Sequence, residues 1–140
     1  MPVMEIHLVE GQFDENQQEA ALGECAAFYA EVLGSPMERV RVFVTEHKPG
    51  QFFAAGKLAR VDPTPAPYFK FIVLEGRPVE QRHRLLTGFT DIIERVLGVE
   101  RERIRGGCWA VPAEDWAIGG EPASRKRGDE IAARQQAASS

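Results

Sequence analysis

The chain has 140 residues and a mass of 15.6 kDa, which favours one domain with a modest core. Hydrophobic residues make up 44% of it and charged residues 27%, a composition that indicates a globular rather than a disordered chain. Because the formal net charge is −4 and no charge-free stretch is long enough to span a membrane, we expect neither nucleic acid nor a membrane as a partner.

The first half of the chain predicts a strand, a helix and a second strand. Residues 3–9 alternate between apolar and polar, as a half-buried strand does. The face of this strand that we expect to be buried carries Met4, Ile6 and Leu8. Asp14 is a candidate helix N-cap, and Gln17 completes a weak capping box. An apolar stripe at helical spacing follows, made of Leu22, Ala26, Tyr29 and Leu33. Gly34 is placed to end this helix, and residues 39–45 alternate again as a strand.

The second half repeats this order of elements. Residues 68–74 predict a strand, and Pro78 stands at the first position of a predicted helix. The apolar stripe of this helix consists of Leu86, Phe89, Ile93, Val96 and Leu97. Gly98 is placed to end it, and residues 103–110 predict the last long strand.

Four short motifs recur at a constant offset of about 64 residues, which indicates an internal duplication. Residues 8–12 return as 73–77, 32–34 as 96–98, 38–41 as 102–105, and 52–56 as 116–120. We therefore divide the single domain into a first repeat at 1–60, a Pro-rich linker at 61–67, a second repeat at 68–127, and a frayed polar tail at 128–140.

This order predicts an α+β fold built from tandem β-α-β repeats. Because parallel strands joined by a helix need a right-handed crossover, two such units can form one four-stranded sheet with both helices on one face. We expect the other face to carry apolar residues, among them Val3, Val9, Val40 and Val42. This face would need a partner, and closing several copies around a symmetry axis, as in a trimer, would bury it.

The cysteines and histidines predict no metal site. Cys25 and Cys108 sit in apolar stretches and form no CxxC pair, and the three histidines lack metal-ligand spacing. Residues 1–5 show no basic or apolar start typical of a secretory signal. We therefore expect buried thiols in a reducing cytoplasm, with no metal and no cofactor.

Several segments resemble a known family. The segments PVMEIHLVEG at 2–11, VRVFVTE at 40–46 and GQF at 50–52 are similar to 4-oxalocrotonate tautomerase. The likeness returns with EGR at 75–77 and IGGEPASR at 118–125. The chain thus resembles a fused, two-repeat member of the tautomerase superfamily, like malonate semialdehyde decarboxylase and cis-3-chloroacrylic acid dehalogenase. The resemblance implies a tautomerase-type β-α-β fold, a homotrimer, and an amino-terminal proline as the catalytic group.

Pro2 is the residue that this resemblance makes catalytic. Removing Met1 would leave Pro2 as a secondary amine on a fixed ring. Burial and neighbouring arginines disfavour the cation of such an amine, so its pKa should fall towards neutral. A base of that strength can take a proton from a carbon beside a carbonyl and return it elsewhere. With Met1 retained, the nitrogen would instead be a peptide amide.

Arginines supply the expected binding groups. By resemblance, Arg77 occupies the carboxylate-binding position, just before Pro78 at a helix N-terminus. Its counterpart in the first repeat is Gln12, a departure that fits one working site per chain. Arg41 and Arg105 match the family's strand arginine, which polarises the substrate carbonyl. An outward charge paired with glutamate is the alternative for both.

Four further residues are candidates for the walls of the site. Phe52 and Trp116 match the family's aromatic residue beside the proline, with core packing as the alternative. Tyr29 stands where the dehalogenase has a histidine, and a core aromatic is the alternative. Glu38 lies near the position of an aspartate in the decarboxylase, and a turn carboxylate is the alternative.

These residues favour a tautomerase that moves a proton within a small 2-oxo or 2-hydroxyenoic carboxylate. One alternative is a hydratase or decarboxylase of a short 3-oxo acid such as malonate semialdehyde, and another is a trimeric binding protein without catalysis. Leu74 and Ala110 stand where the dehalogenase has a second arginine and a water-activating glutamate, so hydration of a haloacrylate loses support.

Overall fold

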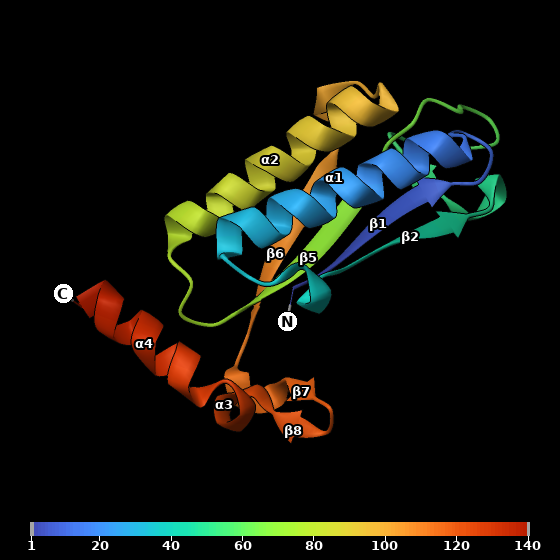
Figure 1. Ribbon diagram of the computed structural model, residues 1–140. Coiled ribbons are helices and arrows are strands. Elements are labelled where there is room, and N and C mark those ends of the chain that lie inside the picture. Colours follow the sequence, from blue (N-terminus) through green and yellow to red (C-terminus); the bar gives the residue numbers. More distant parts are fainter. Residues whose placement is uncertain (1, 140) are drawn as a thin grey trace.

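The computed structural model describes residues 2–139, with side chains through residue 138. A four-stranded sheet forms its centre, with the strands in the order β2-β1-β5-β6. These are β1 (Val3–Val9), β2 (Arg41–His47), β5 (Tyr68–Leu74) and β6 (Arg105–Val111). The two long helices, α1 (Glu15–Leu33) and α2 (Val79–Leu97), cover one face of the sheet side by side (Figure 1). The predicted α+β fold of two β-α-β repeats is confirmed.

Local sequence sets the ends of the helices. The Asp14 side chain accepts a hydrogen bond from the Gln17 backbone at 2.7 Å, and the Gln17 side chain accepts one from the Asp14 backbone, so the predicted capping box is present. Gly34 ends α1 in the left-handed conformation with φ of 62°. The strands after the helices begin two residues later than predicted, because residues 37–39 and 101–103 each form a single 3₁₀ turn.

The two repeats are joined back to back. Within each repeat the strands are parallel, β1 with β2 and β5 with β6, whereas the central strands β1 and β5 are antiparallel, with Val3 opposite Ile72. The amino end of β1 therefore lies beside the carboxyl end of β5. The strands of the two repeats therefore run in opposite directions. At each end of the sheet, the amino ends of the strands of one repeat lie beside the carboxyl ends of the strands of the other.

The core lies between the sheet and the helices. Met4, Ile6 and Leu8 are buried on the helix-covered face, as predicted. An aromatic cluster fills the centre, with ring pairs at centroid distances of 5.0 to 6.3 Å. It consists of Tyr29, Phe69, Phe71 and Phe89.

The opposite face of the sheet is open, and its composition differs from the prediction. Val42 pairs with Met4 and packs against the core with Val40, and Val9 is buried, so these valines do not supply the open face. Val42 faces the helices because the parallel register of β1 and β2 places it beside Met4, a residue of the buried face. The open face instead carries Phe43 and Trp109, which are 45% and 44% exposed.

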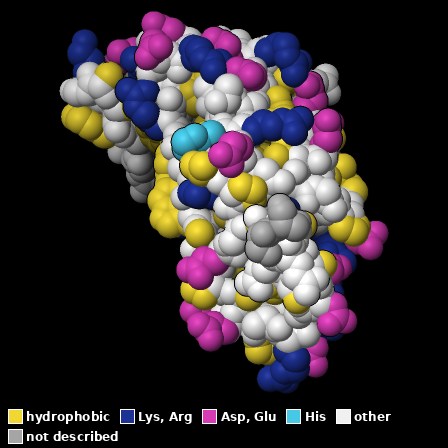
Figure 2. Space-filling view, turned by 90° about the vertical axis from the view of Figure 1, so that its left-hand side faces the viewer, with side chains coloured by type: hydrophobic (Ala, Val, Ile, Leu, Met, Phe, Trp, Pro, Cys, Tyr) yellow, Lys and Arg dark blue, Asp and Glu magenta, His cyan; other side chains and the backbone are white. Residues whose placement is uncertain are grey.

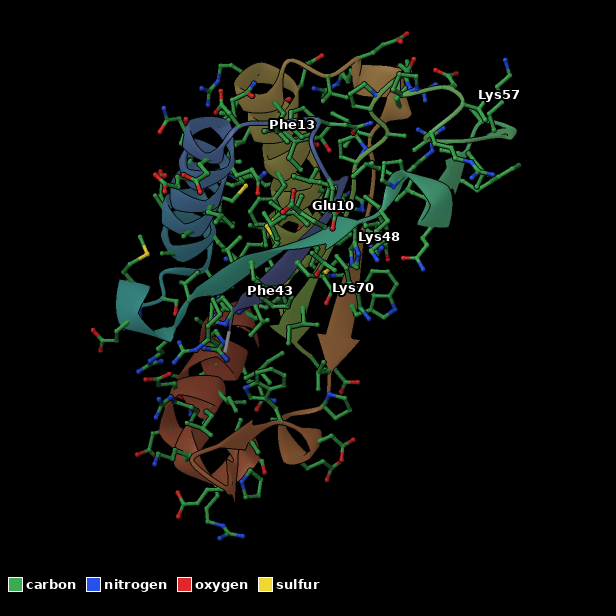
Figure 3. The ribbon with its side chains drawn as sticks, turned by 90° about the vertical axis from the view of Figure 1, so that its right-hand side faces the viewer. Glu10, Phe13, Phe43, Lys48, Lys57 and Lys70 are labelled. Atoms are coloured by element: carbon green, nitrogen blue, oxygen red, sulfur yellow. The ribbon has the colours of Figure 1, made fainter. Side chains whose placement is uncertain are left out.

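Polar groups on the open face contact one another across strands. The Lys70 ammonium lies 4.8 Å from the centroid of the Trp109 ring, and the His7 and His47 rings are joined by a 2.8 Å hydrogen bond. Figure 3 places Phe43 and Lys70 on this sheet, with the helices to one side of it. Over the face of the molecule shown in Figure 2, basic and acidic side chains are interspersed.

The C-terminal segment is structured, which corrects the expectation of a frayed tail. After β6 come a small hairpin, β7 (Ala117–Ile118) with β8 (Glu121–Pro122), and two helices, α3 (Ala123–Lys126) and α4 (Gly128–Ser139). The matching hairpin of the first repeat is β3 (Phe53–Ala54) with β4 (Lys57–Leu58). Within residues 2–139, no helix is both long and apolar enough to cross a membrane.

Substituting Gly106 by alanine is expected to destabilise the fold. Gly106 lies opposite Phe69 in the sheet, and a Cβ at this position would stand 2.1 Å from the ring of that buried side chain. We expect the free energy of unfolding in urea to fall by about 1–3 kcal/mol, the usual cost of overpacking. Gly23→Ala is the control, since a Cβ there meets nothing within 4 Å and α1 should gain up to about 1 kcal/mol. Equal effects of the two substitutions would contradict this account.

Candidate active site

Pro2 is buried at the amino end of β1 and faces a cavity of about 60 Å³. Leu33 at the end of α1 and Leu74 at the end of β5 provide apolar walls. The charged side chains that line the cavity are Arg39, Arg77, Arg127, Glu130 and Arg134. The residues after α3 bring the C-terminal segment to this cavity, and Figure 3 shows this segment below the sheet. The cavity therefore combines a buried proline with four cationic groups and one carboxylate.

The sheet topology explains why Pro2 and Arg77 meet although 75 positions separate them in the sequence. Pro2 directly precedes β1, and Arg77 follows β5 after a turn at Gly76, whose φ of 101° favours glycine. Because β1 and β5 run antiparallel, the start of β1 and the end of β5 lie at the same end of the sheet. The sequence prediction named both residues, and the structure places them on one cavity.

Arg77 is held in place and partly shielded from water. One of its terminal nitrogens donates to the Leu33 carbonyl at 3.1 Å, and its own carbonyl accepts from the Arg82 side chain at 3.3 Å. Burial lowers the pKa of Arg77 to about 10, with a further contribution from the nearby charge of Arg134. The guanidinium still carries its charge at neutral pH, and its desolvation strengthens its attraction for an anion.

Sequence reasoning missed four residues of this cavity: Arg39, Arg127, Glu130 and Arg134. The Nε atom of Arg127 is buried and has no hydrogen-bond partner within the described part of the chain, so a donor stands ready for an acceptor. For Glu130 and Arg134 the sequence does contain a signal of a helix. An acidic pair at 129–130 after Gly128, followed by an Ala-rich run, is typical of a helix start.

Arg41 and Trp116 lie in an adjoining cavity of about 430 Å³. Arg39 and Arg127 line both cavities, so the two spaces are neighbours. The Arg41 backbone donates to the Pro2 carbonyl at 2.9 Å, while its side chain donates to the Glu38 carbonyl at 2.9 Å. Glu38 also lines this cavity and is exposed. This group of predicted residues is therefore near Pro2 but outside its immediate cavity.

Arg105 and Phe52 lie at the opposite end of the sheet. They line a cavity of about 370 Å³ together with Arg103 and Pro67, the counterparts of Arg39 and Pro2. The Arg105 backbone donates to the Pro67 carbonyl at 3.1 Å, as that of Arg41 does to Pro2. The nitrogen of Pro67 is part of a peptide bond, however, so it has no lone pair that could serve as a base. Within one chain, Phe52 and Arg105 do not meet Pro2.

Tyr29 is a fully buried member of the aromatic core. Its hydroxyl donates to the Ile72 carbonyl and lies 3.3 Å from that of Val3, and burial raises the pKa of the phenol well above its usual value. The side chain therefore ties α1 to the two central strands beside Pro2. The geometry favours the core alternative that the sequence left open.

Tyr29→Phe provides a direct measurement of this role. We expect the free energy of unfolding to fall by about 1 kcal/mol, the usual worth of a hydrogen bond, because the ring still fills its place. Catalytic turnover should change by less than about threefold, since the hydroxyl contacts backbone rather than the cavity. A loss of several orders of magnitude in turnover, with stability unchanged, would contradict a purely structural role.

The remaining reactive groups do not form a metal or thiol site. Within residues 2–139, no three His, Cys, Asp or Glu side chains are grouped so that they could hold a metal ion. Burial raises the pKa of the Cys25 thiol to about 12, and burial also raises that of Cys108, so both thiols stay protonated at neutral pH.

Comparison with known proteins supports the reading of two repeats. Two segments, residues 2–61 and 67–126, each match the family model described as tautomerase enzyme. The chain belongs to the tautomerase family. The two matched segments correspond to the two β-α-β units, and the second ends at residue 126, just before α4.

Related proteins include both single-repeat and fused tautomerases. A 2-hydroxymuconate tautomerase from Pseudomonas putida is 39% identical over 59 residues, which are 42% of this chain and 92% of that protein. The crystal structure of a native fused 4-OT has a TM-score of 0.82 and 26% identity, and the match covers 90% of this chain and 98% of that one. A fused 4-OT described as an asymmetric trimer has a TM-score of 0.80 and 24% identity, with coverage of 90% and 98%.

Proposed function

We propose that this chain is a tautomerase that uses Pro2 as general base and then general acid on a small 2-oxo or 2-hydroxyenoic carboxylate. The observation that carries the proposal is the position of Pro2, buried on the same cavity as the partly desolvated Arg77. The imino nitrogen would accept and return the proton, and the guanidinium would hold the carboxylate.

The proton transfer needs no group beyond these. The nitrogen of Pro2 takes the proton from the 2-hydroxyl of the enol, and this oxygen becomes the carbonyl oxygen at C2. The electron pair of the C=C bond moves to the carbon at its far end, which is C3 in a simple enol. That carbon then takes the proton back from Pro2, which returns to its neutral form. Cationic side chains that line the cavity stabilise the negative charge that develops on oxygen.

The surroundings of Pro2 support an amine that is neutral in the cell. Leu33 and Leu74 provide apolar walls, and four arginines lie on the same cavity against one glutamate. Both desolvation and positive charge disfavour a prolinium cation, so the pKa of a free Pro2 amine should lie below that of an exposed one. The proposal requires that Met1, which lies outside the described residues, is removed.

We also propose that the chain works as a homotrimer. The open sheet face exposes Phe43 and Trp109, and closing it against other copies would remove this surface from water. A trimer would also give Phe52 and Arg105 of one copy the opportunity to reach the Pro2 cavity of another. Arg41 and Trp116 are the candidates within the same chain, since they line the neighbouring cavity.

Three measurements test the proposal together. The intact mass of the purified chain should lack Met1, its light-scattering mass should be three times that of one chain, and it should catalyse the ketonisation of phenylenolpyruvate or 2-hydroxymuconate. A protein that keeps Met1, assembles normally and shows no ketonisation would be the non-catalytic binding protein instead. The hydratase or decarboxylase alternative has less support, because the Tyr29 hydroxyl is bonded to backbone and Glu38 lines the adjoining cavity rather than that of Pro2.

A further inference from the structure

Glu130 places a carboxylate on the cavity of Pro2 from helix α4. Its two oxygens accept hydrogen bonds from the two terminal nitrogens of Arg39 at 3.0 and 3.1 Å. This two-bond geometry is the one by which a guanidinium grips the carboxylate of a ligand. Arg39 also lowers the pKa of the Glu130 carboxyl, so the carboxylate is ionised at neutral pH. Glu130 therefore occupies the guanidinium of Arg39.

The rest of the cavity is arranged for a further anion. Arg77, Arg127 and Arg134 leave an excess of positive charge after Glu130 has paired with Arg39. The buried Nε of Arg127, which has no acceptor among the described residues, points to the same deficit of negative charge. The space beside Pro2 is small, about 60 Å³, and Glu130 lies on its wall, so moving this side chain would enlarge it.

Helix α4 supplies the part of the wall that carries this ion pair. It follows α3 directly, and its Glu130 forms the ion pair with Arg39, a residue of the 3₁₀ turn before β2. The side chains of this pair are 27% and 46% exposed, so water can compete for both partners and the pair can open at modest cost. Opening it would enlarge the cavity and release Arg39 at the same moment.

We propose that Glu130 is a built-in substitute for the carboxylate of the substrate. In the empty chain it occupies Arg39 and holds α4 over Pro2, and an entering carboxylate displaces it, so that Arg39 joins Arg77 in binding the ligand. This proposal rests on the proposed function for the identity of the site, but it makes Arg39 a specificity-determining residue and α4 a lid.

Binding of crotonate, a four-carbon acid with no hydroxyl or keto group to turn over, tests the proposal by calorimetry or NMR titration. Glu130→Gln should lower the Kd by about three- to tenfold, because the internal competitor is removed. Arg39→Gln should raise the Kd by about tenfold, because a charge-assisted contact is lost. Glu24→Gln is the matched control: it breaks an exposed Glu–Arg pair, with Arg95, outside the cavity and should leave the Kd unchanged.

The double variant Glu130→Gln with Arg39→Gln separates displacement from general electrostatics. If Glu130 acts by occupying Arg39, its removal has no further effect once Arg39 is gone, and the double variant binds crotonate as Arg39→Gln does. If the tightening persists in the double variant, Glu130 acts only as a nearby negative charge and the proposal is wrong. An unchanged Kd in Glu130→Gln, or no crotonate binding by any of the proteins, also overturns it.

The same titrations on Pro2→Ala keep this inference separate from the proposed function. Crotonate binding does not require a reactive amine, so the pattern of Kd values should persist there. A chain that shows this pattern but lacks ketonisation would retain the lid and lose the tautomerase proposal. A chain that ketonises its substrate but lacks this pattern of Kd values would support the tautomerase proposal and contradict the lid.

Discussion

Replacing Pro2 by alanine is expected to lower kcat/KM for ketonisation by about a hundredfold to ten-thousandfold, the usual contribution of a positioned general acid–base. Alanine would leave a primary amine that is freer to rotate than the nitrogen of proline, which is part of a closed ring. The fall should appear mainly in kcat, since Arg77 still binds the carboxylate. A steady-state assay with phenylenolpyruvate measures both parameters.

The internal duplication supplies a matched control. Pro67 is the counterpart of Pro2 at the other end of the sheet and is equally buried, but its nitrogen lies within a peptide bond. Pro67→Ala should therefore leave kcat/KM within about threefold of the original. Equal losses in the two variants, or an unchanged rate in Pro2→Ala, would contradict the role assigned to Pro2. The thermal midpoint of each variant shows whether the fold is kept.

Replacing Arg77 by glutamine is expected to lower kcat/KM by about ten- to a hundredfold, the scale of losing a charge-assisted contact of ~1.5–3 kcal/mol. Glutamine is the residue type found at the equivalent position of the first repeat, Gln12, so the substitution makes the two ends alike. The loss should appear as a higher KM, because the removed interaction binds the carboxylate before and during proton transfer. Arg77→Lys should recover only part of it, since an ammonium cannot form the two-bond contact.

Arg84→Gln is the control for the loss of one positive charge. Arg84 lies on α2, the helix that follows Arg77. Its guanidinium is 3.8 Å from Glu31, and its side chain is 58% exposed. Screening by solvent makes its effect on an anion in the Pro2 cavity small. Similar KM values for Arg77→Gln and Arg84→Gln would mean that net charge, not a specific contact, governs binding.

The repeat and its periodicity predicted most of the fold. Alternation in residues 3–9 identified the buried face of β1, and the capping box at Asp14 and the glycine at 34 located both ends of α1. The strand starts were placed two residues early, because a short 3₁₀ turn, at 37–39 and at 101–103, leads directly into each strand. Valines at 40 and 42 were assigned to the wrong face, because alternation within one strand does not show which of its faces meets the helices.

Residues of the candidate site could be predicted only where a single sequence motif identified both the residue and its role. Pro2 and Arg77 were named because each matches a family position directly. Phe52 and Trp116 also match each other between repeats, yet the antiparallel joint sends them to opposite ends of the molecule, and no local pattern reveals which end faces Pro2. Arg39, Glu130 and Arg134 were missed because their roles depend on where α4 docks, and the polar segment that forms α4 has no apolar stripe that would predict its docking face.

The linker between the repeats leads to the end of the sheet where Pro67 lies, opposite to the end where Pro2 lies. Severing the backbone between Ala66 and Pro67 would leave β1 and β5 paired while giving the second half a new chain terminus. That terminus would be a secondary amine in a space already lined by Arg103, Arg105 and Phe52. A single hydrolysed peptide bond would thus give the second half of this molecule an amino-terminal proline of its own.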